Sequence, residues 1–424
     1  MTSTPAVPTR QDRRARAAVA ALFLTNGALF ANLIPRYPEI KAGLDLGDAT
    51  YGLALAAFPA GAIAAGLAAG ALVRRFGSAR TAVAGTALTA LGVLGAGSAP
   101  GVAALAGVLA LAGAMDAVTD VAQNAHGLRV QRRYGRSIIN GFHALWSIGA
   151  VLGGSAAAGA IALDLPLPVH LGVSGAVFVA VALVALRFLL PGPDGPGEQV
   201  DVDVVDAAEE AASVRRRRPV VGPRTALVLA ALVVVAVGGT LVEDAGNTWG
   251  ALYLSRSLEA PATVAAFGYI ALVGAQTVGR LVGDRLVDRF GQRAVARTGA
   301  LVAAVGMGAA LAVPTVAGTV AGFGLAGLGV ATLVPAAMQQ ADALPGLRPG
   351  TGLTLVSWLM RLGFLASPPL VGLVADSAGL RVGLLVVPLA GVAVAVLAQV
   401  LPGRGDRGSL DPQPVTVGTT SPRA

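Results

Sequence analysis

Twelve apolar runs divide this chain, and their length constrains its fold more than any other feature. A helix needs about 20 mostly apolar residues to cross a bilayer, and each run is about that long. Two pairs of runs are nearly continuous and are divided only by glycine and proline, at residues 98–101 and at Pro314. The expected spans are centred near Leu24, Gly61, Leu88, Gly113, Leu152, Ala180, Val235, Gly274, Val305, Leu325, Phe364 and Ala393. This pattern predicts an all-α membrane protein with twelve transmembrane helices.

The composition excludes a soluble enzyme. Of the 424 residues, 55% are hydrophobic and only 13% are charged, whereas a soluble domain has about 25% charged residues. The net charge of +8 does not indicate nucleic-acid binding, because the arginines stand in short loops between apolar runs. The chain has no cysteine, and His126, His143 and His170 have no metal-ligand spacing. We therefore expect no metal and no cofactor, and as partners only a small-molecule substrate and the lipid bilayer.

The N-terminal run admits two interpretations. It follows Arg13, Arg14 and Arg16, as the apolar part of a signal peptide would. It also contains Asn26 and Asn32, and many equally apolar runs follow it. A retained first transmembrane helix is the better interpretation.

Basic residues predict the orientation. Most of them fall in the even-numbered connections, such as Arg74–Arg75, 129–136, Arg215–Arg218 and 285–297. The side of the membrane that carries more arginine and lysine is the cytoplasmic side. The sequence thus predicts a multi-pass protein of a bacterial plasma (inner) membrane with both termini in the cytoplasm.

An internal repeat divides the chain into two halves. A shift of 214 residues places residues 75–77 on 289–291, and Gly85, Gly92 and Gly113 on other glycines. Between the halves lies a Gly/Pro-rich and charged stretch typical of a solvated linker. The expected divisions are a tail (1–16), a six-helix half (17–191), a cytoplasmic linker (192–223), a second half (224–402) and a tail (403–424).

The connection after the second helix of each half resembles the loop signature of the major facilitator superfamily, which has a glycine, an acidic residue, a basic residue and a glycine in a tight basic turn. The matching residues are Arg75, Gly77, Asp288, Arg289 and Gly291. Arg74 stands where the acidic residue is expected, and Asp284 stands in place of the leading glycine of the second copy. The resemblance implies that these loops gate the cytoplasmic ends of the helices.

Three longer stretches, 120–127, 135–149 and 243–254, are similar to a bacterial branch of that family akin to fucose-permease-like carriers. The resemblance implies two pseudo-symmetric six-helix halves, a secondary transporter of a small solute that works by alternating access, and function as a monomer. It says little about the substrate, because one fold serves many.

Charged and polar groups inside the apolar runs are the candidate functional residues, since they are expensive in a bilayer and usually face a cavity or a partner. Asp116 and Asp120 are one helical turn apart, and Asn124 continues the stripe. Two carboxylates this close resist ionising together, which suits proton coupling. The plainer alternative is that each pairs with an arginine. His143 and Trp146 share a face of the fifth helix, where they serve either proton relay and ring stacking or ordinary packing.

In the second half, Glu243 is followed by Gly246 and Asn247, which suggests a local helix break beside a cavity. Arg361 inside the eleventh run is a counter-charge for an acidic residue or an anionic substrate, or else part of a structural ion pair. Arg280 lies four residues before Asp284, which favours an ion pair between them. Asn26 and Gln276 are further cavity candidates, although such groups also hold helices together.

These residues predict a proton-coupled secondary transporter and not an enzyme. A drug or metabolite efflux antiporter is the alternative to an uptake carrier. A membrane sensor or a membrane-embedded enzyme is a remoter alternative, since the sequence has no phosphate-binding loop, no H-E-x-x-H and no G-x-S-x-G.

Overall fold

The computed structural model describes residues 8–135, 138–192, 222–347 and 350–403. Within these ranges the chain forms helices only, and twelve of them are long and apolar enough to cross a membrane. Each expected centre lies within one of these twelve helices, so the predicted spans are confirmed. The predicted linker and the predicted C-terminal tail lie mostly outside the described residues, whereas residues 8–16 of the predicted N-terminal tail are described.

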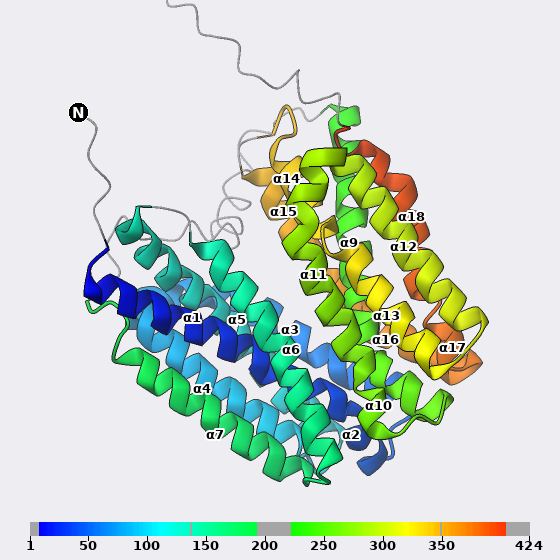
Figure 1. Ribbon diagram of the computed structural model, residues 1–424, viewed down its shortest axis with the longest axis horizontal. Helices are drawn as coiled ribbons and strands as arrows, with labels where there is room; N and C mark the ends of the chain where they lie inside the picture. The colour runs from blue at the N-terminus through cyan, green and yellow to red at the C-terminus, as the bar shows by residue number, and fades with distance from the viewer. Residues whose placement is uncertain (1–7, 136–137, 193–221, 348–349, 404–424) are drawn as a thin grey trace, which may run out of the picture.

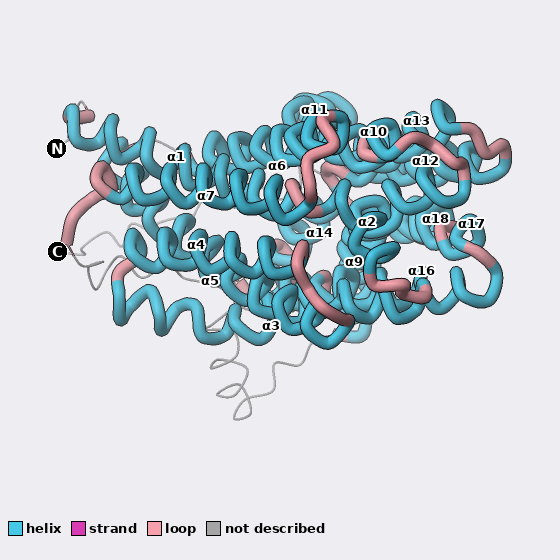
Figure 2. The backbone as a smooth tube through the Cα atoms, turned by 90° about the horizontal axis from the view of Figure 1, so that it is seen from below, coloured by secondary structure: helices cyan, strands magenta, loops and turns pink. Residues whose placement is uncertain are grey.

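The helices form two bundles (Figure 1). The N-terminal bundle contains α1 (Arg10–Ala31), α2 (Tyr37–Gly43), α3 (Asp48–Phe76), α4 (Ser78–Ala96), α5 (Val102–Tyr134), α6 (Ile139–Ala162) and α7 (Leu167–Leu186). The C-terminal bundle contains α9 (Pro223–Leu252), α10 (Ala262–Ala265), α11 (Phe267–Phe290), α12 (Gln292–Ala312), α13 (Val316–Val330), α14 (Leu333–Asp342), α15 (Thr351–Leu359), α16 (Arg361–Ala378), α17 (Leu380–Gly383) and α18 (Val386–Leu397). Figure 2 shows the helices from below, where the described loops between them are short.

The first helix begins before its apolar run. Thr9 and Asp12 form a capping box, in which each side chain accepts a hydrogen bond from the backbone of the other. Such a box satisfies backbone donors that the first turn leaves free. The helix therefore starts at Arg10 and includes arginines that the sequence assigned to the N-terminal tail.

The 214-residue repeat recurs in the packing. Gly113 of α5 lies against the backbone of Phe58 in α3, and Gly327 of α13 lies against the backbone of Leu272 in α11. Each of these pairs falls on the other under the shift. A Cβ on either glycine would come within about 3 Å of the facing backbone, at 3.0 Å from Phe58 Cα and 3.1 Å from Leu272 Cα. Small residues allow membrane helices to approach this closely, so the repeat is a repeat of helix contacts.

Helix breaks lie elsewhere than expected. The predicted break near Gly246 is wrong, because α9 is continuous from Pro223 to Leu252 and ends in a π-helical turn at Tyr253–Ser257. Gly246 instead gives room first to the side chain of Leu272, which a Cβ there would clash with, and then to Phe323, whose Cδ1 would lie 3.3 Å from that Cβ. The tenth span is interrupted between α13 and α14 and the eleventh at Met360 between α15 and α16, and the first, eighth and twelfth spans also consist of more than one helix.

The two bundles meet at one end and diverge toward the other (Figure 1). At the closed end α16 packs on α3, and α11 packs on α6. Asp376, at the end of α16, accepts hydrogen bonds from the backbone N–H groups of Asp48 (2.8 Å) and Ala49 (3.1 Å), in the first turn of α3. A carboxylate is favourable there because free N–H groups and the helix dipole point at it.

Candidate functional site

A connected set of polar side chains lies where α1, α5 and α6 meet. The buried Asn26 of α1 donates from Nδ2 to Asp116 Oδ1 at 2.8 Å, and its Oδ1 accepts from Trp146 Nε1 at 2.8 Å. Close packing makes this possible. A Cβ on Gly27 would lie 2.9 Å from the carbonyl carbon of Trp146, so only glycine lets α1 and α6 approach this far.

The connected polar side chains continue along α5 to residues that are exposed to solvent. Asp120 Oδ1 accepts from Asn124 Nδ2 at 3.0 Å, and Asn124 Oδ1 lies 3.2 Å from His143 Nε2. Asp120 and His143 are exposed, although each lies within a transmembrane helix. The stripe of Asp116, Asp120 and Asn124 therefore runs from a buried amide to a solvent-accessible carboxylate and imidazole.

Gln123 joins the two parts and was not among the expected site residues. It is fully buried, and its Nε2 lies 3.3 Å from Asp120 Oδ1 and 3.4 Å from Asn26 Oδ1. Its Oε1 has no hydrogen-bond partner in the described chain. A glutamine three residues after an aspartate, inside an apolar run, was the available signal, because i and i+3 share a helix face.

A second polar group lies between α9 and α11. Glu243 Oε2 accepts from the buried Gln276 Nε2 at 2.6 Å and lies 3.8 Å from an Arg280 guanidinium nitrogen. The expected pair of Arg280 with Asp284 is therefore wrong. Arg280 reaches Glu243 on the neighbouring helix, since in the described residues its ion pair is with that carboxylate.

The neighbouring Asp244 lies close to the contact between the two bundles. Its Oδ2 accepts from Thr248 Oγ1 at 3.3 Å, and the carbonyl of Thr248 accepts from Tyr51 Oη of α3 at 2.9 Å. Tyr51 also packs edge-on against Trp249, with ring centroids 5.0 Å apart. Glu243 and Asp244 thus contact different surroundings, as adjacent residues on a helix do.

Two further candidates have unused polar atoms. Asn247 Oδ1 and Arg361 Nε are buried, and within the described ranges neither atom has a hydrogen-bond partner. Arg361 is the first residue of α16, beside the break at Met360, whose carbonyl accepts from Thr240 Oγ1 of α9 at 3.0 Å. No ion pair within the described residues includes Arg361.

The expected gating turns have one shared geometry. Gly77 and Gly291 both adopt positive φ, 82° and 86°, and each ends one helix and starts the next. Only glycine adopts this conformation readily. Arg75 stacks on Phe76, and Arg289 stacks on Phe290, at 5.4 and 5.3 Å from the ring centroids. Asp288 also has interaction partners in the structure.

A third turn of this kind was missed. Gly379 has φ 86° and ψ 156°, and the glycine–acid–glycine spacing of Gly372, Asp376 and Gly379 matches the loop signature. This copy lies at the opposite end of the bundles, where Asp376 contacts α3. The described residues contain no cluster of three or more metal-ligating side chains, so nothing in them is arranged to hold a metal ion.

Comparison with known proteins agrees with this arrangement. A sequence model described as Major Facilitator Superfamily matches residues 19–285 and 244–422. An uncharacterised transporter, y4wD, of Sinorhizobium fredii is 32% identical over 385 residues, which are 90% of this chain and 97% of that protein.

Solved structures match the fold. The nucleoside transporter NupG has a TM-score of 0.69 at 12% identity, covering 92% of this chain and 98% of its own. A D-xylose–proton symporter has a TM-score of 0.66 at 14% identity, with coverage of 92% and 98%. Twelve spans in two related bundles, paired glycine turns and a family match along almost the whole length have one explanation: this chain is a transporter of the Major Facilitator Superfamily.

Proposed function

We propose that this protein is a proton-coupled secondary transporter, and that Asp116 and Asp120 carry the proton. The observation that supports this most strongly is the pair itself. The two carboxylates lie one turn apart within a membrane span and accept hydrogen bonds from amides, and neither has a cationic partner among the described residues. An uncompensated charge at this depth is costly, so the pair favours holding a proton between its carboxylates.

The exposed His143 and Asp120 provide the entry for this proton. A proton taken up at Asp120 would reach Asp116, one helical turn away on α5, while the amides of Gln123 and Asn26 would hold the two carboxylates by hydrogen bonds of 3.3 and 2.8 Å. The half-buried Asp116 would then be neutral in one state of the cycle and charged in the other. This difference is what couples proton release to the movement of the halves.

The substrate would bind between the halves, facing both polar groups. Asn247 Oδ1 and Arg361 Nε are buried atoms without partners in the described chain, and such atoms are costly unless a ligand or water satisfies them. A hydroxyl of a small polar solute would donate to Asn247 Oδ1, and a hydroxyl or carboxylate oxygen would accept from Arg361 Nε. The nucleoside transporter and the D-xylose–proton symporter with the same fold move hydroxylated solutes, as their names state, and this supports the same substrate class here.

With both termini in the cytoplasm of a bacterial cell, the divergent end of the bundles would face the cytoplasm. Both described ends of the chain lie at that side of Figure 1. The structure would then correspond to an inward-facing state, closed outside by α3 against α16. In the outward-facing state this contact would open while the ends beside Gly77 and Gly291 close. We propose that a single chain carries out this cycle.

The test uses purified protein in liposomes. A thermal-shift screen of sugars, nucleosides and organic acids identifies a solute, and its flux is then measured with and without an imposed pH gradient. We expect gradient-driven flux in the unchanged protein and none with Asp120→Asn. The matched control is Asp164→Asn, which removes an exposed carboxylate of the same half outside the network. Gradient-driven flux that survives Asp120→Asn removes that residue from the mechanism.

A further inference from the structure

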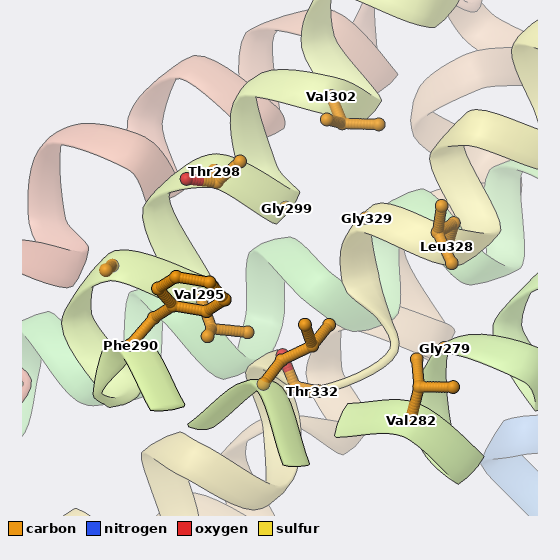
Figure 3. A pocket seen from close by; sticks show the side chains of 12 residues that line it. Gly279, Val282, Phe290, Val295, Thr298, Gly299, Val302, Leu328, Gly329 and Thr332 are labelled. Atoms are coloured by element: carbon orange, nitrogen blue, oxygen red, sulfur yellow. The ribbon is translucent and has the colours of Figure 1, made fainter. Parts of the chain in front are cut away.

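A groove in the C-terminal bundle belongs to neither polar group. It has a volume of about 510 Å³ and lies between α11 and α12, with α13 and Thr332 forming its floor (Figure 3). Its walls are apolar apart from two threonines, and Phe290, Leu286 and Leu328 at its edges are 48%, 40% and 41% exposed. All of its lining residues lie within membrane spans. An apolar groove of this kind in a bilayer meets lipid chains and not water.

The groove has a polar rim at one end only. It ends beneath the turn at Gly291, where the guanidinium of Arg289 lies 5.3 Å from the centroid of the Phe290 ring. Arg285, one turn before, is exposed as well. The aspartates of the same helix are separate from this rim, since Asp284 and Asp288 line another hollow with Gln292 and Gln339. The groove therefore combines an apolar slot with a cationic mouth.

Two glycines leave room for the groove, and the N-terminal half keeps only one of them at the equivalent positions. Gly329 and Gly299 face one another at the floor of the groove. Under the 214-residue shift, Met115 stands in place of Gly329 and Arg80 in place of Ala294. The first half keeps the arginine stacked on phenylalanine, at Arg75 and Phe76, but it has larger side chains where the slot would lie. The residues that leave room for the groove are thus specific to the second half.

We propose that this groove binds an anionic phospholipid, with one acyl chain between α11 and α12 and the phosphate at Arg285 and Arg289. The volume lies within the range of about 300–1,000 Å³ found for small-ligand sites, and a guanidinium pairs well with phosphate. The lipid chain contacts Thr332, at the break between α13 and α14.

The proposal is tested by native mass spectrometry of the detergent-purified full chain. The protein is titrated with phosphatidylglycerol and, separately, with phosphatidylcholine that has the same acyl chains. We expect tighter binding of phosphatidylglycerol. Arg285→Gln and Arg289→Gln should each weaken it about fivefold, since an arginine near an anionic headgroup contributes about that factor. Arg297→Gln is the control, because Arg297 is equally exposed but lies on another face of α12 from the groove-lining residues.

Substitutions that fill the groove distinguish a specific lipid site from lipid that binds non-specifically around the protein. Thr298→Phe should abolish the preference for phosphatidylglycerol, whereas Ala84→Phe, at the equivalent exposed position of α4, should leave it unchanged. If Thr298→Phe does not give folded protein, Val302→Phe fills the same groove, and Leu88→Phe is its control. Equal binding of the two lipids, or binding that is the same in Thr298→Phe and Ala84→Phe, would overturn the proposal.

Discussion

The two polar groups of this transporter differ in how their carboxylates are compensated. In the N-terminal half, Asp116 and Asp120 are hydrogen-bonded to amides, and no ion pair of the described chain includes them. In the C-terminal half, Glu243 has both an amide and a guanidinium. A carboxylate beside a fixed cation stays charged, whereas one without a cation responds to protons and ligands. Under the proposed mechanism, Asp116 and Asp120 exchange the proton and Glu243 belongs to a fixed ion pair.

The largest effect should come from removing the uncompensated carboxylates. Asp116→Asn keeps the shape and a hydrogen-bonding oxygen but cannot lose a proton. We expect pH-gradient-driven flux to fall to the level of protein-free liposomes, while exchange of labelled for unlabelled solute continues. Glu243→Gln should retain a response to the gradient. A gradient response lost in Glu243→Gln and kept in Asp116→Asn would reverse the assignment of the two halves.

The ion pair of the second half gives a smaller effect, on stability. Arg280→Gln leaves Glu243 charged beside Gln276 only, while the double substitution with Glu243→Gln leaves no charge. Since Arg280 is 39% exposed, solvent screens the pair, and we expect a coupling free energy of about 1 kcal/mol. Thermal unfolding of the single and double variants in one detergent measures this coupling. A double variant that is less stable than Arg280→Gln would show that Glu243 and Arg280 do not stabilise each other as an ion pair.

The sequence was most informative where a local spacing decides the neighbours. Asp116, Asp120 and Asn124 were expected on one face because helix geometry alone places i and i+4 together, and the structure has them in one stripe. The paired turns at Gly77 and Gly291 followed from the repeat, and they adopt the same backbone conformation.

Contacts between distant segments could not be predicted. Asn26 and Asp116 are 90 residues apart in the chain, and nothing local says which amide meets which carboxylate. For the same reason the sequence predicted that Arg280 pairs with Asp284 on its own helix. Its partner Glu243 lies on α9, and residue spacing along one helix cannot predict a contact with another helix. Gly246 was taken for a break because local sequence does not show that Phe323 packs against it.

Trp146→Phe tests the hydrogen bonds to the buried Asn26, and its expected effect on flux is smaller than that of Asp116→Asn. It removes one donor to Asn26 Oδ1 and keeps the aromatic ring, and Gln123 Nε2, 3.4 Å away, still faces that oxygen. A lost hydrogen bond of this kind costs about 0.5–1.5 kcal/mol. We expect a slightly lower thermal stability and a shifted pH dependence of flux. Trp249→Phe is the matched control, since the Nε1 of that buried ring has no partner in the described chain. The comparison fails if both substitutions shift the pH dependence equally.

The smallest effect is expected where the two halves meet. Asp376 belongs to the second half but holds the first turn of α3 in the first half, so it stabilises the closed end and with it one state of the cycle. Asp376→Asn keeps the side-chain shape and removes the charge from a helix N-terminus, which is worth about 0.3–1 kcal/mol. The ratio of the closed-end population to the open population should therefore fall by a factor of about two to five. Because the chain has no cysteine, two introduced cysteines on α3 and α16 can carry spin labels, and the distance distribution between them measures this population. Ser377→Ala, one residue on, is the control, because its hydroxyl donates within α16 and leaves the contact with α3 intact. An unchanged distance distribution in Asp376→Asn would mean that the apolar packing of α16 on α3 alone sets the closed end.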